Sequence, residues 1–113
     1  MKVIGLIGVM SWKSNKVYYE IINDNSIEVI TPDEDDRNKI HHIIYHELVQ
    51  GIIKYSSRGI FKNIIKKLNE KGARGAILGC TEIPLLIKSG DVNIEVFDTT
   101  RIHAEKAVEM AFK

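Results

Sequence analysis

The sequence is poor in several kinds of residue, and each scarcity narrows the class of protein. Its 113 residues include one cysteine, two prolines and 7% aromatic residues. A single cysteine excludes an internal disulfide and argues against a cysteine-based zinc site. The 16 basic and 15 acidic side chains give a net charge of +1. The basic excess that nucleic-acid and membrane-surface binders usually carry is therefore missing.

Long apolar runs are missing as well. No stretch reaches the roughly 20 apolar residues that cross a bilayer. The short run at 3–7 has no basic lead and no clear cleavage site, so we interpret it as a buried strand rather than a signal peptide. Hydrophobic residues make up 44% and charged residues 27% of the chain, as in ordinary soluble domains. We expect one cytoplasmic domain over 1–113, with no nucleic-acid or membrane partner.

Short aliphatic runs alternate with amphipathic segments throughout the chain. Strands are expected to begin at Val3, Ser26, Gly75 and Asn93. Helices are expected at 14–22, 31–51, 56–72 and 83–87, and after the Asp98-Thr99-Thr100 cap. This order predicts an α/β fold: a single three-layer lobe with a four-stranded parallel sheet flanked by helices.

Two of the expected helices carry specific signals. Thr31 is expected to cap the second helix, with Pro32 in its first position and acidic residues after it. In the last helix, the apolar residues are expected to pack inward against the sheet. These inward residues are Ile102, Ala107, Val108 and Ala111.

Ligands of open parallel sheets bind beyond the carboxyl ends of the strands. Four turns are expected at that edge, at 8–11, 31–33, 79–82 and 98–100. Each precedes a helix start, where free N–H groups and the helix dipole favour an anion. A small carboxylate is therefore a reasonable ligand for this edge.

Cys80 is the residue most suggestive of chemistry. It follows a buried strand and precedes a short expected helix, whose N-terminus would lower the thiol pKa. A partly ionised, nucleophilic or basic thiol is one interpretation, and a small buried hydrophobic residue is the other. His42 and His46 have a spacing that can bind metal, but no third ligand lies nearby in the sequence, so we predict a solvated helix face and no metal site. Gly5 and Gly8 lack the third glycine of a dinucleotide-binding fingerprint.

Several segments together resemble the cofactor-independent aspartate/glutamate racemase family. They are the opening MKVIGLIGVMSW with Tyr18-Tyr19, the Thr31-Pro32 helix start, the GCTEIPLL segment at 79–86 and the FDTTRIHA segment at 97–104. The resemblance implies racemisation of aspartate or glutamate by thiol-based proton transfer at the α-carbon, without pyridoxal phosphate, metal or other cofactor. It implies Cys80 as the catalytic residue. The residues implied to bind the substrate are Val9, Met10, Ser11, Tyr45, Thr81 and Glu82.

The sequence also departs from that family. Its members have two similar lobes, each with one catalytic cysteine, whereas this chain resembles about half of such a protein and keeps Cys80 alone. Val9 replaces a family glycine, and Val49 stands where some relatives have a lysine one turn after Tyr45. A homodimer could bring two Cys80 thiols together. The alternatives are an inactive lobe that dimerises or binds a small carboxylate, and a purely structural protein.

Overall fold

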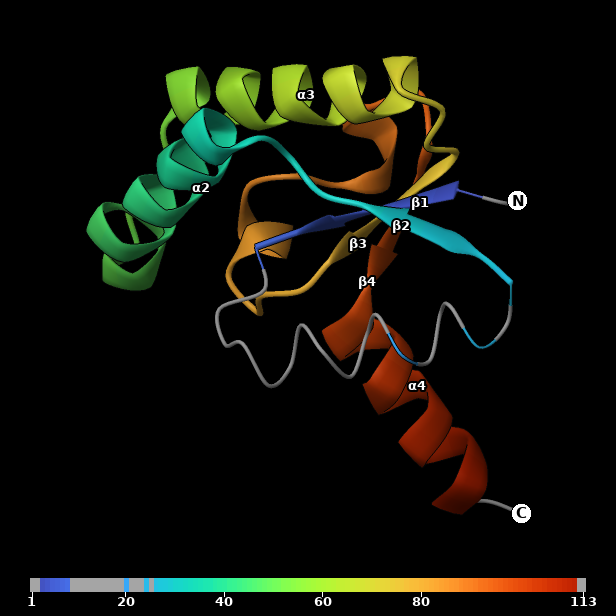
Figure 1. Ribbon diagram of the computed structural model, residues 1–113. Coiled ribbons are helices and arrows are strands. Elements are labelled where there is room, and N and C mark those ends of the chain that lie inside the picture. Colours follow the sequence, from blue (N-terminus) through green and yellow to red (C-terminus); the bar gives the residue numbers. More distant parts are fainter. Residues whose placement is uncertain (1–2, 9–19, 21–23, 25, 112–113) are drawn as a thin grey trace.

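The computed structural model describes residues 3–8, 20, 24 and 26–111. The expected first helix at 14–22 and the turn residues 9–11 fall outside this set, apart from residue 20. The described elements follow one another as strands separated by helices (Figure 1). Their bounds are β1 Val3–Ile7, β2 Glu28–Ile30, α2 Glu34–His46, α3 Tyr55–Glu70, β3 Gly75–Leu78, β4 Glu95–Asp98 and α4 Thr99–Ala111, with short 3-10 helices at Leu48–Gln50, Ile83–Leu85 and Ser89–Asp91.

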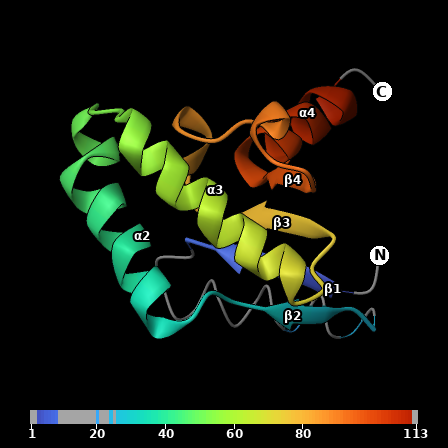
Figure 2. The same ribbon diagram turned by 90° about the horizontal axis from the view of Figure 1, so that it is seen from above.

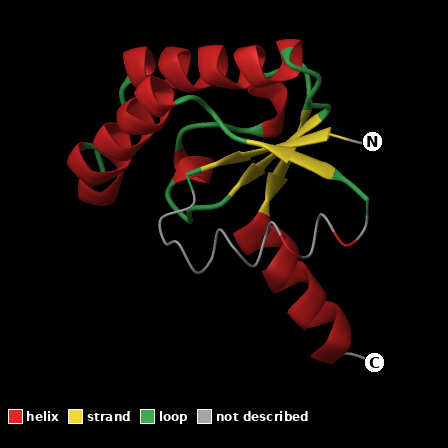
Figure 3. Ribbon diagram, in the orientation of Figure 1, coloured by secondary structure: helices red, strands yellow, loops and turns green. Residues whose placement is uncertain are grey.

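The four strands form one parallel sheet in the order β2-β1-β3-β4. The predicted α/β lobe with a four-stranded parallel sheet is thereby confirmed (Figure 3). The central strands β1 and β3 are short aliphatic runs, and all four residues of β3 are buried. Gly5 pairs with Ile30 on one side and with Ala76 on the other, so β1 is hydrogen-bonded along both edges. This arrangement explains why β1 lacks polar residues.

Helices α2 and α3 cover one face of the sheet, and α4 starts on the opposite side (Figures 1 and 2). The main core lies between the sheet and the first two helices. Its largest fully buried members include Phe61, Ile64 and Leu68 of α3 and Ile40 and Ile44 of α2. A smaller apolar cluster on the other face contains Ile4, Leu6 and Ile77.

The helix ends correct two details of the sequence interpretation. The N-cap of α2 is Asp33, whose side chain accepts a 2.9 Å hydrogen bond from the backbone N–H of Asp36, so Thr31 is not the cap. Beyond α2, a single 3-10 turn ends at Gly51, which adopts the left-handed conformation (φ +79°). A residue without Cβ makes that turn at little cost.

The expected inward packing of α4 is wrong. All four residues predicted to face the core, Ile102, Ala107, Val108 and Ala111, are exposed. After its first turn α4 runs away from the sheet (Figure 1), and among the described elements it contacts chiefly β4. Ala107, Val108 and Ala111 follow helical spacing with Ala104, so these four residues form an apolar stripe on the surface of α4, and Ile102 is on the other side of the helix.

Candidate active site at the carboxyl ends of the strands

The turns after β1 and β3 lie side by side at the carboxyl edge of the sheet. The backbone N–H of Gly79 donates a 2.8 Å hydrogen bond to the carbonyl of Ile7, which extends the pairing of the two strands to their last residues. On the other side of β3, the Thr99 hydroxyl donates a 3.1 Å hydrogen bond to the carbonyl of Leu78. These bonds fix Gly8, Cys80 and the start of α4 along one edge.

Gly8 is held against the 3-10 helix that follows Cys80. Its φ of +73° belongs to the left-handed region that favours glycine. A Cβ placed there would lie 2.2 Å from Cδ1 of Ile83, a fully buried side chain. The absence of a side chain at Gly8 therefore lets the turn after β1 approach the segment that carries Cys80.

Cys80 and Glu82 form a hydrogen-bonded pair. The thiol is 9% exposed, and its Sγ donates to Oε2 of Glu82 at 2.8 Å. The Thr81 hydroxyl donates to the same oxygen at 3.0 Å. A carboxylate that accepts two hydrogen bonds is stabilised in its charged form, and these two bonds lower the pKa of Glu82.

The thiol pKa moves in the opposite direction from the one predicted. Burial, followed by the hydrogen bond to Glu82, raises the pKa of the Cys80 thiol above its usual range. The expected helix dipole is weak because the segment after Cys80 is a 3-10 helix of three residues that begins at Ile83. The structure therefore favours a protonated Cys80 poised as a hydrogen-bond donor.

The other predicted substrate-binding residues divide into three groups. Val9, Met10 and Ser11 lie outside the described residues. Thr81 and Glu82 stand beside Cys80, as described above. Tyr45 projects from α2 and is 54% exposed, with its ring in edge-to-face contact with His41 (centroids 6.5 Å apart). None of the described hydrogen bonds joins Tyr45 to the Cys80 segment.

The sequence interpretation missed Arg37 and His41. Both line a small cavity at the ends of β1 and β2, together with Gly8 and Thr31. Their spacing in the sequence could have indicated this pair. The two residues are four positions apart, so they share one face of the helix that starts beside the sheet edge. His42 and His46 form a separate pair with ring centroids 4.5 Å apart. In the described part of the chain no third histidine, cysteine or carboxylate joins them to make a metal-binding group.

The described residues thus form a parallel α/β sheet with a thiol–carboxylate pair, Cys80 and Glu82, at its carboxyl edge. The sequence profile of the Asp/Glu/hydantoin racemase family matches residues 1–107. The chain belongs to this family. The resemblance inferred from the GCTE and DTT segments is thereby confirmed.

Two crystal structures match nearly the whole chain. One, from Yersinia pestis, is named as a candidate Asp/Glu racemase and is 43% identical with a TM-score of 0.87. The other is an aspartate racemase homologue from Pyrococcus horikoshii OT3, 34% identical with a TM-score of 0.87. The chain is covered to 100% and 99% in these matches, but it spans 50% and 49% of the two proteins.

Two further proteins match the chain at lower sequence identity. The aspartate racemase of Picrophilus torridus shares the fold with a TM-score of 0.63 at 23% identity, over 86% of this chain and 39% of that one. An uncharacterised Pectobacterium carotovorum protein encoded in the pnlA 3′ region is 25% identical in an alignment of length 91, and the match covers 75% of this chain and 55% of that protein. The chain thus spans about half the length of the proteins it matches. None of the described helices is long and apolar enough to cross a membrane.

Proposed function

We propose that the chain performs racemase-type isomerisation of an acidic amino acid, aspartate or glutamate, with Cys80 as a proton-transfer group. Family membership supports the reaction class. The hydrogen bond from Cys80 to Glu82 is the observation that supports the residue assignment, because it holds an S–H group at the ligand-binding edge of the sheet. The substrate carboxylate is a suitable ligand for that edge, because helix N-termini bind anions.

Inversion at the α-carbon requires only proton transfers, and no other group leaves or joins the substrate. A base removes the α-proton from one face, and the electron pair of the broken C–H bond stays on the substrate, delocalised into its carboxylate. An acid on the opposite face then supplies a proton. Burial and Glu82 favour the protonated thiol, so Cys80 suits the role of acid: its S–H bond breaks and a thiolate remains. In the reverse reaction that thiolate removes the proton.

The second acid–base group must come from outside this chain if it is also a thiol, since the sequence has one cysteine. We propose that a second copy supplies its own Cys80 across a shared cleft. Two observations support this dimer. The chain spans half the length of the structures it matches, and α4 exposes an apolar stripe that its own sheet does not cover.

Exchange in heavy water tests the proposal. The protein is incubated with L-aspartate and, separately, L-glutamate in D₂O, and NMR and chiral chromatography follow deuterium at the α-carbon and formation of the D-isomer. We expect deuterium incorporation with inversion, which the Cys80→Ser variant loses. Absence of exchange at high protein concentration, or undiminished exchange in Cys80→Ser, would overturn the assignment. Exchange without inversion would mean a single base and would overturn the two-thiol site.

A further inference from the structure

The cavity beside Gly8 has basic side chains in its lining. It has a volume of about 50 Å³, room for a group of a few atoms such as a carboxylate, and its described lining is Leu6, Gly8, Thr31, Pro32, Arg37, Ile40 and His41. No described lining residue is acidic. Arg37 brings a permanent positive charge, and the His41 imidazole and the Thr31 hydroxyl bring further hydrogen-bonding groups. The cavity therefore favours an anion.

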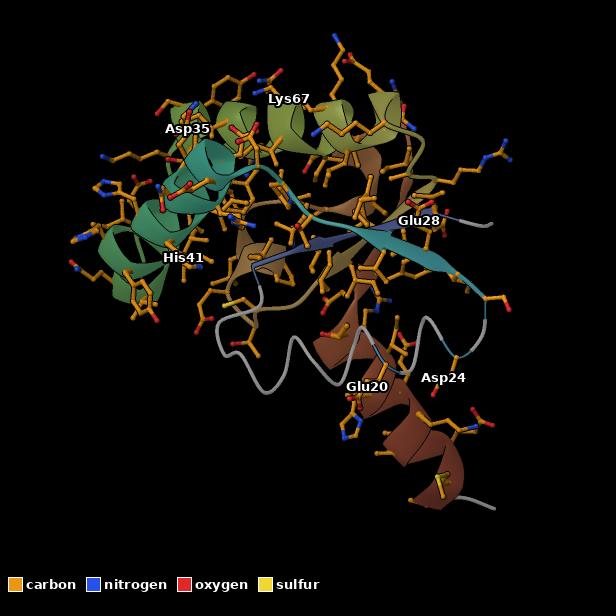
Figure 4. The ribbon with its side chains drawn as sticks, viewed as in Figure 1. Glu20, Asp24, Glu28, Asp35, His41 and Lys67 are labelled. Carbon is orange, nitrogen blue, oxygen red and sulfur yellow. The ribbon has the colours of Figure 1, made fainter. Side chains whose placement is uncertain are left out.

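The two basic side chains are available for a ligand. Within the described residues, neither the Arg37 guanidinium nor the His41 ring nitrogens take part in a hydrogen bond or ion pair. Two acids at the start of α2 are engaged elsewhere: Asp33 caps the helix, and Asp36 pairs with Lys67 at 3.2 Å. Glu34, three residues before Arg37, is exposed and forms no ion pair with it in the described part of the chain. In Figure 4, His41 lies on the side of α2 near the end of β1, whereas Asp35 and Lys67 lie toward the top of the molecule.

The cavity and Cys80 are close neighbours at the carboxyl edge of the sheet. The cavity lies at the ends of β1 and β2, and Cys80 follows β3, on the other side of β1. Two strand spacings separate β2 from β3, about 10 Å. The cavity and Cys80 therefore lie along the same edge of the sheet, where one small ligand can contact both.

We propose that Arg37 and His41 form the subsite for the side-chain carboxylate of the substrate, and so select acidic over neutral amino acids. The inference rests on the proposed function, because Cys80 is taken as the reactive end. Arg37 supplies the planar pair of N–H donors that fits a carboxylate, and His41 adds one N–H donor. Tyr45, one turn farther along α2, packs edge-on against His41 and positions its ring.

Measurements of ligand binding test this subsite independently of the proposed reaction. The dissociation constants of L-aspartate and its neutral isostere L-asparagine are measured by NMR titration of the whole chain, in wild type, Arg37→Gln, His41→Gln and Cys80→Ser. We expect wild type and Cys80→Ser to prefer aspartate by about tenfold or more, the usual effect of a charge-assisted hydrogen bond. Arg37→Gln should remove that preference and His41→Gln should reduce it. His42→Gln, whose side chain is outside the cavity, is the matched control.

The outcomes are distinct. Equal binding of aspartate and asparagine by the wild type, or an unchanged preference in Arg37→Gln, would overturn the subsite. A preference that depends on Arg37, found together with no α-proton exchange, would support the subsite and overturn the proposed reaction. Both substituted side chains are exposed, and a thermal melt of each variant verifies that it is folded.

Discussion

Ser57 donates a 2.5 Å hydrogen bond to Oε1 of Glu47, and both residues are buried. The bond joins the end of the α2 segment to the first turn of α3, and thus holds the two helices that cover one face of the sheet. A buried carboxyl without its partner is costly. We expect Ser57→Ala to lower the free energy of unfolding by about 1–3 kcal/mol. Ser56→Ala, an exposed neighbour in the same turn, should change it by less than about 0.5 kcal/mol. Urea denaturation measures both, and equal effects would contradict the role of the bond.

Substitution of Gly8 tests the close approach at the sheet edge. Gly51→Ala should lose about 1–2 kcal/mol from its left-handed backbone alone, since nothing lies within 4 Å of the added Cβ. Gly8→Ala has a similar φ but meets Ile83 Cδ1 at 2.2 Å, so we expect a further loss of about 1–3 kcal/mol.

A double variant isolates the contact. Ile83→Val removes Cδ1 and leaves Cγ1, which is 3.5 Å from the added Cβ. Gly8→Ala with Ile83→Val should therefore lose less stability than the sum of the single variants. Additive losses in the same denaturation series would show that Ile83 does not set the cost.

The sequence predicted the sheet well because its buried strands are continuous apolar runs that admit few other structures. Val3 and Gly75 begin β1 and β3 as expected. The second and fourth strands were each placed two residues early, since β2 begins at Glu28 and β4 at Glu95. Ser26 has a φ of +61°, which interrupts extended backbone before β2. Such a turn depends on backbone geometry that residue type alone does not determine.

The candidate site was predictable in position but less so in chemistry. The place of Cys80 after a buried strand follows from the pattern, whereas its pKa depends on burial and on the Glu82 side chain folding back toward it. The apolar stripe of α4 was visible in the sequence. Whether other residues pack against such a stripe depends on the tertiary structure, and here the chain's own sheet does not cover it.

The effect of Glu82 on the thiol gives a pH prediction. A thiolate beside a carboxylate is disfavoured, and the hydrogen bond stabilises the thiol form, so both raise the pKa of Cys80. In Glu82→Gln the negative charge is gone, and we expect the thiol pKa to fall while burial keeps part of the shift. The midpoint of iodoacetamide labelling against pH should move to lower pH, with faster labelling below it.

A matched variant accompanies the labelling experiment. Glu70→Gln removes the same charge at the exposed end of α3 and should leave the labelling midpoint where it is in the wild type. A midpoint that stays fixed or rises in Glu82→Gln would contradict the hydrogen-bonded pair. Labelling only after unfolding would assign Cys80 to the core.

The apolar stripe of α4 provides the test of the proposed dimer. Ala104, Ala107, Val108 and Ala111 follow helical spacing and are all exposed, whereas Lys106 and Glu109 form an exposed ion pair on the opposite face at 3.5 Å. If a second copy covers the stripe, Val108→Glu places a charge in the interface and should weaken dimerisation by about tenfold or more. Lys106→Gln changes the net charge equally but should have little effect, because exposed ion pairs contribute about 0–1 kcal/mol. Sedimentation velocity over a micromolar concentration series distinguishes the two variants. A wild-type chain that stays monomeric throughout, or a dimer that Val108→Glu leaves intact, would remove α4 as the interface.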